Sequence, residues 1–419
     1  MFRGWSATLA TLTALGAMVA AGCGDSNTGD NASGAAQTSS PSTTSSAPAK
    51  DPNAGKPYRI LMLTSLSGPA GIYGAGELQG AKAAQKALND QGGINGRQVD
   101  LNVKDFGSDP AKAVTLLQKE ITGGHKPDFV IAGINASDAL AIAPAANAAK
   151  IISWSAAPAP DLGDPKKSPY TFLINPSYND VGRGAARAIA AAGYKRAATL
   201  TQNDDPGKSN SAGFKEVFEQ LGGKVVAEEL YTPFANDVTG PFERAYAKKP
   251  DVIYLPFEGT IAVFRAHRAA GSSIPMYCDI GCTNDYVKTF GADTMANTYA
   301  FALPLQTRQP EERTDRQKQF IAALDAVGGD KGQGLILPAI AYDPIMVTAQ
   351  AAKQAGSTDT VAVTKALESL TGDTTWAQGI QNHFTPTSHF SLQTEDKFPF
   401  VPFSFKAPYR DGVFDISAT

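Results

Sequence analysis

The feature that most constrains this chain is a rhythm of short apolar runs and amphipathic stretches, which occurs twice. The first set opens with Tyr58–Thr64 (YRILMLT), followed by a helical stripe from about residue 71 to 91. The second set opens near Ala197. Short apolar runs of this kind suit strands buried on both faces, and strand–helix alternation builds parallel sheets. The sequence therefore predicts two doubly wound α/β lobes, each with a mostly parallel sheet covered by helices.

Within the two sets, individual elements follow from apolar periodicity and from turn residues. We expect strands at 58–64, 99–103, 129–132, 151–154, 197–201, 224–230, 251–256 and 275–278. We expect helices at 71–91, after the Asp109-Pro110 cap, and at 137–149, 208–221, 238–248, 259–270, 314–327, 339–355 and 360–370. After Thr371 the chain is rich in proline and aromatic residues, and we expect short strands there.

The order of the elements also predicts how the chain is divided between the lobes. We place the first lobe at 57–175 plus 306–380 and the second at 176–305 plus 381–419. Ligands of open α/β sheets bind beyond the carboxyl ends of the strands, and two such lobes leave a cleft between them. We therefore expect the functional residues in the loops that follow strands.

The amino terminus reads as a targeting segment. Residues 1–22 are apolar with one charge, Arg3, and are too short to span a bilayer comfortably. They end in small residues followed by Cys23, which resembles a bacterial lipoprotein signal whose cysteine receives the lipid. The alternative is an ordinary secretory signal in which Cys23 is incidental.

The segment after Cys23 has no means of folding by itself. Residues 24–56 contain no Val, Leu, Ile, Met, Phe, Tyr, Trp or Cys. Such a composition cannot offset its chain entropy, so we expect 23–56 to be a flexible, lipid-anchored linker. The mature chain is then tethered to the extracytoplasmic side of the cell membrane without spanning it.

The two remaining cysteines, Cys278 and Cys282, lie close together in the sequence C-D-I-G-C. In an oxidising compartment such a pair predicts a disulfide, although the very small loop leaves free thiols as an alternative. No histidine lies nearby to suggest a metal site, and we expect no metal and no cofactor.

Charge and motifs exclude several classes of protein. The net charge is −3, with 37 Lys and Arg against 40 Asp and Glu, so we expect no nucleic-acid partner. The sequence contains no G-x-x-x-x-G-K-[ST], H-E-x-x-H or G-x-S-x-G motif, and its histidines are scattered. No nucleophile is placed beside a base, so we predict no catalytic residues and no enzyme activity.

Two loop-rich stretches carry a family resemblance. The segments LSGPAGIYGAGELQGAKAAQKALNDQGGINGR and DFVIAGINASDALAIAPAANAAKIISWSAA resemble the solute-binding proteins of branched-chain amino acid ABC transporters. These are type I periplasmic binding proteins of the Leu/Ile/Val-binding class, and the resemblance runs from about 57 to 375. It implies a monomer that captures a small organic solute by lobe closure and delivers it to an ABC permease.

The resemblance also implies site residues in the first lobe. Ser137, beside Ala136, matches the serine that holds the ligand's carboxylate at a helix start, although it could be only an N-cap. The second carboxylate-contacting stretch is matched by Trp154, Ser155, Ala156 and Ala157. Tyr73 matches an aromatic residue that lines the cleft.

In the second lobe the match is incomplete. The family's ammonium-binding glutamate is matched by Ile280, with Asp279 next to it. Glu258 stands where the family often has a tyrosine, and Phe257 before it offers an aromatic wall. Either Asp279 or Glu258 binds the ammonium group of an amino acid, or the ligand is an aliphatic or aromatic carboxylate without an amine. A ligand sensor for a membrane partner would use the same site.

Overall fold

The computed structural model describes residue 53, residues 55–157, 159–232, 235–256, 261–279, 297–308, 310–331 and 334–391, and short backbone stretches between 403 and 414. The signal segment, Cys23 and nearly all of the linker lie outside these residues. So do Phe257, Glu258, Ile280 and Cys282. None of the described helices is both long enough and apolar enough to cross a membrane.

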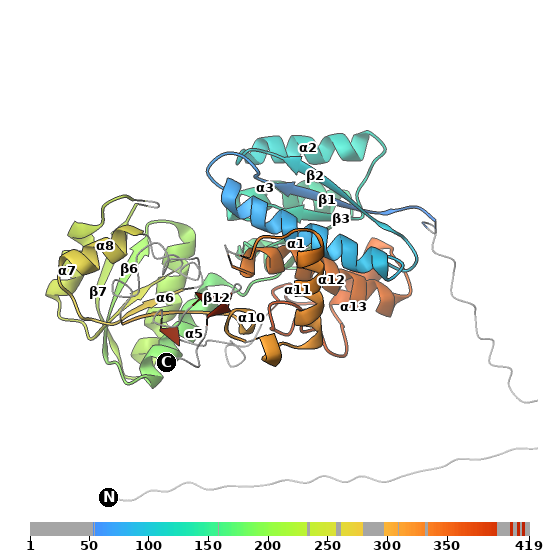
Figure 1. Ribbon diagram of the computed structural model, residues 1–419. Helices are drawn as coiled ribbons and strands as arrows, with labels where there is room; N and C mark the ends of the chain where they lie inside the picture. The colour runs from blue at the N-terminus through green and yellow to red at the C-terminus, as the bar shows by residue number, and fades with distance from the viewer. Residues whose placement is uncertain are drawn as a thin grey trace, which may run out of the picture. The chain divides into compact units, whose positions relative to one another are not determined.

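The first lobe is built on a five-stranded parallel sheet with strand order β2-β1-β3-β4-β5 (Figure 1). Its strands are β1 (Tyr58–Thr64), β2 (Val99–Asp105), β3 (Phe129–Ala132), β4 (Ile152–Ser155) and β5 (Thr171–Leu173). Its helices are α1 (Gly71–Asp90), α2 (Pro110–Thr122), α3 (Ala136–Ala148), α4 (Pro160–Gly163), α11 (Asp315–Ala326), α12 (Ile336–Ala355) and α13 (Thr360–Leu367). The parallel order confirms the α/β prediction for this half.

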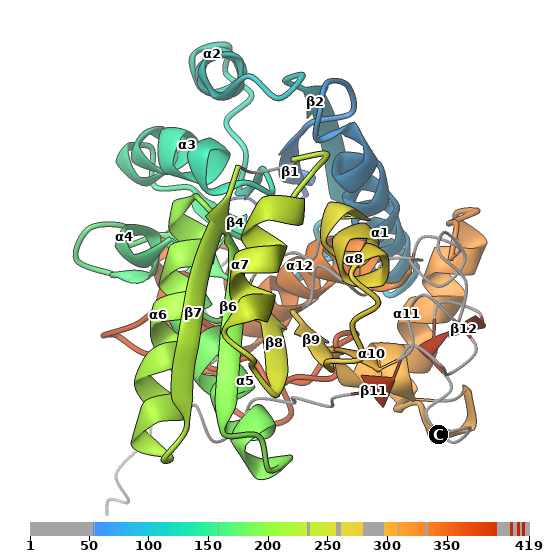
Figure 2. The same ribbon diagram turned by 90° about the vertical axis from the view of Figure 1, so that its left-hand side faces the viewer.

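The second lobe is built on a six-stranded sheet with strand order β11-β10-β9-β8-β6-β7. Its strands are β6 (Arg196–Gln202), β7 (Lys224–Tyr231), β8 (Val252–Leu255), β9 (Met276–Cys278), β10 (Thr298–Ala300) and β11 (Phe403–Ser404), of which only β11 is antiparallel to its neighbour. Its helices are α5 (Tyr178–Ala191), α6 (Asp205–Gln220), α7 (Thr239–Ala247) and α8 (Ile261–Ala269). Figure 2 shows α6 and α7 on either side of β7 and β6.

Four further short elements complete the described chain: α10 (Pro304–Thr307), a 3-10 turn at Pro310–Glu312, and the antiparallel strands β12 (Tyr409–Arg410) and β13 (Val413–Phe414).

Local sequence signals explain where the helices begin and end. The Asp109 side chain accepts hydrogen bonds from the backbone N–H groups of Ala111 and Lys112, and Pro110 occupies the first turn of α2. This is the cap that the Asp-Pro pair predicts. At the other end of the lobe, α12 stops at Gly356, whose φ of 59° is in the left-handed region that glycine adopts easily.

The tail differs from the prediction. Between 371 and 391 the chain forms isolated bridges instead of strands, and residues 381–391 lie on the first lobe, not the second. The N–H of Leu173 donates to the carbonyl of His389 at 2.9 Å, and the N–H of Ser391 donates to the carbonyl of Leu173 at 2.9 Å. The His389 ring is buried, 4.0 Å from the Phe172 ring. The tail therefore extends the first sheet beyond β5 before β11 joins the second.

Candidate functional site

The carboxyl ends of β3 and β4 bring the predicted first-lobe residues together. After β3 the chain turns at Gly133, with φ of 68°, and Asn135 in extended conformation is the N-cap of α3. Ser137 is the second residue of the helix and is exposed, whereas Asp138 is buried. The alternative that Ser137 is only an N-cap is therefore wrong, because Asn135 occupies that position.

Hydrogen bonds join this turn to the loop after β4. The Ser155 hydroxyl donates to the carbonyl of Gly133 at 3.4 Å and accepts from the N–H of Ala157 at 3.0 Å. The carbonyl of Ala156 accepts from the Asn175 amide at 2.8 Å. Ser155, Ala156 and Ala157 are buried, so their contribution to any ligand site is the shape of a fixed loop beside the start of α3.

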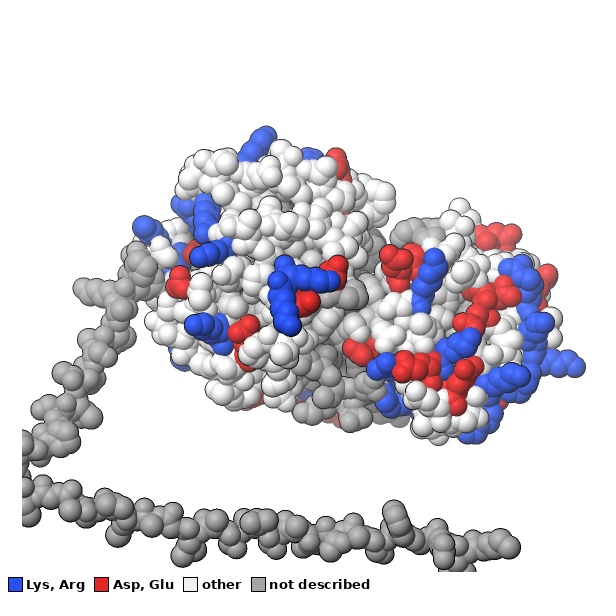
Figure 3. Space-filling model, turned by 180° about the vertical axis from the view of Figure 1, so that it is seen from behind, with Lys and Arg blue, Asp and Glu red and all other residues white. Residues whose placement is uncertain are grey.

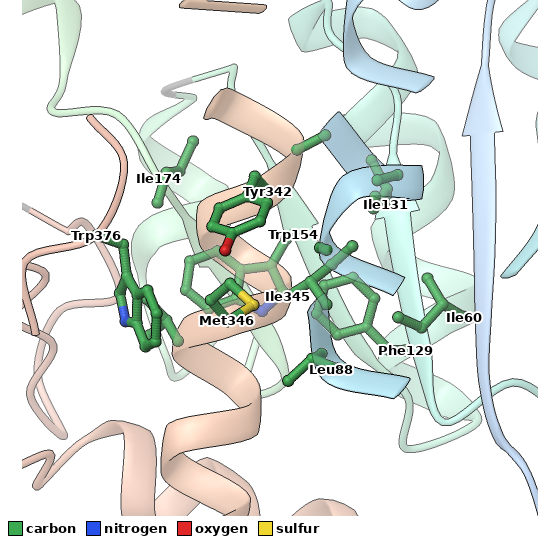
Figure 4. Close-up of a cluster of buried hydrophobic side chains, with 14 of the residues drawn as sticks. Ile60, Leu88, Phe129, Ile131, Trp154, Ile174, Tyr342, Ile345, Met346 and Trp376 are labelled. Carbon is green, nitrogen blue, oxygen red and sulfur yellow. The ribbon is translucent and has the colours of Figure 1, made fainter. Parts of the chain in front are cut away.

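Trp154 does not line this site. Its side chain is 1% exposed and packs into the core, 5.5 Å from the Phe172 ring and 5.3 Å from the Phe384 ring. Figure 4 shows it in one buried cluster with Phe129, Ile345 and Met346. Successive side chains of a strand point to opposite faces, which corrects the expectation that this ring forms a wall of the cleft.

Tyr73 lies in the first turn of α1, half-buried. It packs with Ile134, in the turn after β3, against a cluster that includes Leu303 and Leu337. The loop before α1 is fixed by Asp105, a residue that the sequence reasoning missed. The Asp105 carboxylate accepts from the Ser67 hydroxyl at 2.6 Å and from the N–H of Gly107 at 2.8 Å.

The hydrogen bonds to Asp105, that from Ser67 foremost, lower its pKa to about 2, so the charge persists over the physiological range. The signal available in the sequence was an aspartate two residues after the expected strand 99–103.

Glu77 was also missed. It is 1% exposed on α1, and the Thr64 hydroxyl donates to its carboxylate at 3.1 Å. Burial raises its pKa to about 8, although the hydrogen bond from Thr64 opposes the shift; the charge of Asp138 raises it further. Glu77 stands four residues before Ala81, on the apolar stripe of the predicted helix, and a charged residue at such a position is a signal that the sequence contained.

In the second lobe, Asp279 follows β9 and its side chain is turned inward, 1% exposed. Its carboxylate accepts from the Asn210 amide of α6 at 2.6 Å, and the Asn210 carbonyl accepts from the Tyr254 hydroxyl at 2.8 Å. Burial, together with the Asp279 charge, raises the Tyr254 pKa well above its usual value. The hydrogen bond between Asp279 and Asn210 thus lies in the interior of the second lobe.

The residue before Asp279 is oxidised. Cys278 is disulfide-bonded, and its predicted partner Cys282 lies outside the described residues, so the pairing stays a prediction. In the part of the chain that the structure describes, no group of three or more His, Cys, Asp or Glu side chains could hold a metal ion.

The face of the second lobe seen in Figure 3 carries side chains of both charges. In Figure 3, Lys and Arg side chains gather along the outer edge of the second lobe, with Asp and Glu side chains beside them. Several of these charges are paired with each other, as in Arg183 with Glu216 at 2.8 Å and Arg244 with Glu229 at 2.8 Å. This agrees with the near-neutral net charge of the sequence.

Comparison with known proteins matches a family model described as periplasmic binding protein over residues 57–392. A Leu/Ile/Val-binding protein of Rhizobium johnstonii is 26% identical over 74% of this chain and 83% of its own length. A branched-chain amino acid transporter substrate-binding protein of Streptococcus pneumoniae, solved with isoleucine, aligns with a TM-score of 0.69 at 22% identity, covering 86% of this chain and 98% of its own.

A solute-binding protein of an ABC transporter from Rhodopseudomonas palustris, solved with 4-hydroxybenzoate, also aligns with a TM-score of 0.69. It is 19% identical and covers 86% of this chain and 95% of its own. At these identities the two structures show the shared two-lobed fold, which agrees with the two sheets described above.

Proposed function

Since the chain belongs to the periplasmic binding protein family, a family of extracytoplasmic solute-binding proteins, we propose that it captures a branched-chain or related amino acid and delivers it to an ABC permease. The observation that carries this proposal is the exposed Ser137 at the start of α3, next to the fixed loop Ser155–Ala157. The relative named as a Leu/Ile/Val-binding protein supports the choice of ligand class.

The start of α3 offers what a carboxylate needs without a basic side chain. The first N–H groups of a helix have no partner within the helix, and its dipole places partial positive charge there. The Ser137 hydroxyl adds a donor in the same place. The carboxylate of the solute is thus bound by neutral dipoles of the first lobe, and closure of the second lobe over it completes the site.

Replacing Ser137 with alanine removes the hydroxyl and leaves the backbone donors in place. We expect affinity to fall by about 1–2 kcal/mol, roughly ten- to thirtyfold. Calorimetric titration with leucine, isoleucine and valine measures this, and Thr115→Ala, which removes an exposed hydroxyl from α2, serves as the control. Equal affinities for the wild type and Ser137→Ala would remove Ser137 from the site.

A second candidate ligand is a carboxylate without an amine. It is favoured by the burial of Asp279, whose carboxylate accepts from the Asn210 amide at 2.6 Å. The relative solved with 4-hydroxybenzoate is a precedent on the same fold. Titration with 4-methylpentanoate beside leucine decides between the two classes, because only an amino acid site loses affinity when the amine is deleted. No heat with any of these solutes would reject both.

We further propose that Cys23 carries a lipid that anchors the chain outside the cytoplasmic membrane through the linker 24–56. Cys23→Ala should move the protein from the membrane fraction to the soluble extracytoplasmic fraction, as immunoblotting of fractionated cells would show. Solute affinity should not change, because the linker contains none of the proposed site residues. Retention of the variant in the membrane to the wild-type extent would contradict the anchor.

A further inference from the structure

Two buried carboxyl groups, Glu77 and Asp138, lie near the start of α3. Glu77 reaches from α1 to the Thr64 hydroxyl at the carboxyl end of β1. Asp138, in the first turn of α3, lies close enough for its charge to act on Glu77. Asp138 directly follows Ser137 in the first turn of α3, so Glu77 is separated from the proposed ligand-binding hydroxyl by one residue.

Asp138 and Glu77 differ in how well their surroundings stabilise a negative charge. Asp138 accepts from the backbone N–H of Asn135 at 3.3 Å, and it lies at the positive end of a helix. Within the described part of the chain, Glu77 accepts only from the Thr64 hydroxyl. Two neighbouring buried carboxyl groups resist ionising together, so the proton is retained by the one whose surroundings stabilise a negative charge less. That residue is Glu77.

The other elements around Glu77 bring no compensating charge in the described part of the chain. From β1 it faces Thr64, and from α3 it faces Asp138. The helix α12 approaches this turn of α1 through Leu337 and Pro338, which are apolar. No described Lys, Arg or His forms an ion pair with either acid.

We propose that Glu77 holds the proton that allows the first-lobe site to accept an anion, so that solute binding above neutral pH takes up a proton. This inference rests on the proposed function, since it requires a carboxylate at Ser137. An ionised Glu77 would place a second buried negative charge near the ligand's carboxylate. A protonated Glu77 is neutral and leaves the helix dipole and the hydroxyl to act on the ligand.

The direction of the pH effect follows from linkage. The Glu77 pKa is about 8 in the free protein, and a bound carboxylate raises it further because like charges disfavour ionisation. Below about pH 7 Glu77 is protonated in both the free and the bound protein, so affinity is independent of this group. Above about pH 8 the free protein loses the proton and the complex regains it, so affinity falls by up to about tenfold per pH unit.

Calorimetry in buffers of different ionisation enthalpy measures the number of protons that the protein takes up when it binds the solute. Leucine and 4-methylpentanoate are titrated into the wild type at about pH 7 and about pH 8.5, in phosphate and in Tris. We expect proton uptake only at the higher pH, with affinity about threefold to tenfold weaker there. Glu77→Gln, a neutral shape mimic of the protonated acid, should take up no proton at either pH, and its affinity should not fall between about pH 7 and about pH 8.5.

Asp343→Asn is the matched control. Asp343 is another buried acid, with a pKa raised to about 7 by burial, but its carboxylate accepts from the backbone N–H groups of Ala377 and Gln378. It is not part of the proposed site, so proton uptake should stay at the wild-type value. Thermal melting checks that both variants are folded.

The possible outcomes separate the two proposals. Binding without proton uptake by the wild type at about pH 8.5 overturns the role of Glu77 and leaves the proposed function standing. The role of Glu77 is also overturned, with the proposed function intact, if Glu77→Gln takes up as many protons as the wild type. No binding of either solute by the wild type overturns both proposals.

Discussion

Replacing Arg97 with methionine should lower the free energy of unfolding by about 3–5 kcal/mol, because it leaves a largely buried carboxylate without its partner. The Arg97 side chain is 3% exposed, and its guanidinium donates to both carboxylate oxygens of Asp128, at 3.0 and 2.7 Å. It also donates to the Thr358 hydroxyl at 2.7 Å and to the carbonyls of Lys56 and Pro57 at 3.1 and 2.7 Å. The substitution removes the hydrogen-bond donor of Asp128, of Thr358 and of the Lys56–Pro57 backbone at once.

These bonds join distant parts of the first lobe. Lys56 and Pro57 mark the entry of the chain into β1, Asp128 precedes β3, and Thr358 follows α12. Urea denaturation followed by circular dichroism measures the loss. Lys86→Met is the control, since it breaks an exposed pair with Asp90 whose contribution should be below about 1 kcal/mol. Equal midpoints for the two variants would contradict a structural role for Arg97.

The second large effect concerns the contact between α1 and α12. A Cβ atom on Gly80 would lie 1.8 Å from the Pro338 carbonyl oxygen, too close for any side chain without a shift of one helix. Gly80→Ala should therefore destabilise the chain by about 1–3 kcal/mol, or more if the helices cannot move apart. Both helices contribute to the core that covers β1, so the whole first lobe is affected.

The control for Gly80→Ala is the same substitution at Gly240, measured in the same denaturation experiment. Gly240 lies in α7, where a Cβ would meet only the end of Arg244 at 3.5 Å. Gly240→Ala should leave stability unchanged or raise it, since alanine favours a helix more than glycine does. If the two substitutions shift the urea midpoint alike, close packing at Gly80 is not what fixes α1 against α12.

Sequence patterns predicted the elements better than the direction of individual side chains. The expected strand Tyr58–Thr64 agrees with β1, and the Asp109-Pro110 cap is confirmed, because backbone patterns and caps are local properties. Trp154 was misplaced because a family match aligns a loop but does not say which face of the preceding strand a residue occupies. Glu77 was missed because its burial depends on β1 and α3, which are distant in sequence.

The tail was misassigned for a related reason. Aromatic residues favour strands. Which of the two sheets such a segment joins depends on which sheet has an unpaired edge strand within its reach. His389 lies beside the edge strand β5. Its ring is hydrogen-bonded to the Thr171 carbonyl at 2.8 Å and stacks on the Phe172 ring. Nothing within residues 381–391 identifies this neighbour, so only the three-dimensional structure assigns them to the first lobe.

The position of His389 beside β5 has a consequence for the order in which the chain can fold. The first lobe combines residues 58–173 with a return stretch that includes Ser391, whereas five strands of the second sheet lie between Arg196 and Ala300. A chain that emerges from its amino terminus supplies those five strands before it supplies the last strand-like edge of the first sheet. During synthesis, five of the six strands of the second sheet are thus available before the segment His389–Ser391, which pairs with β5 of the first sheet.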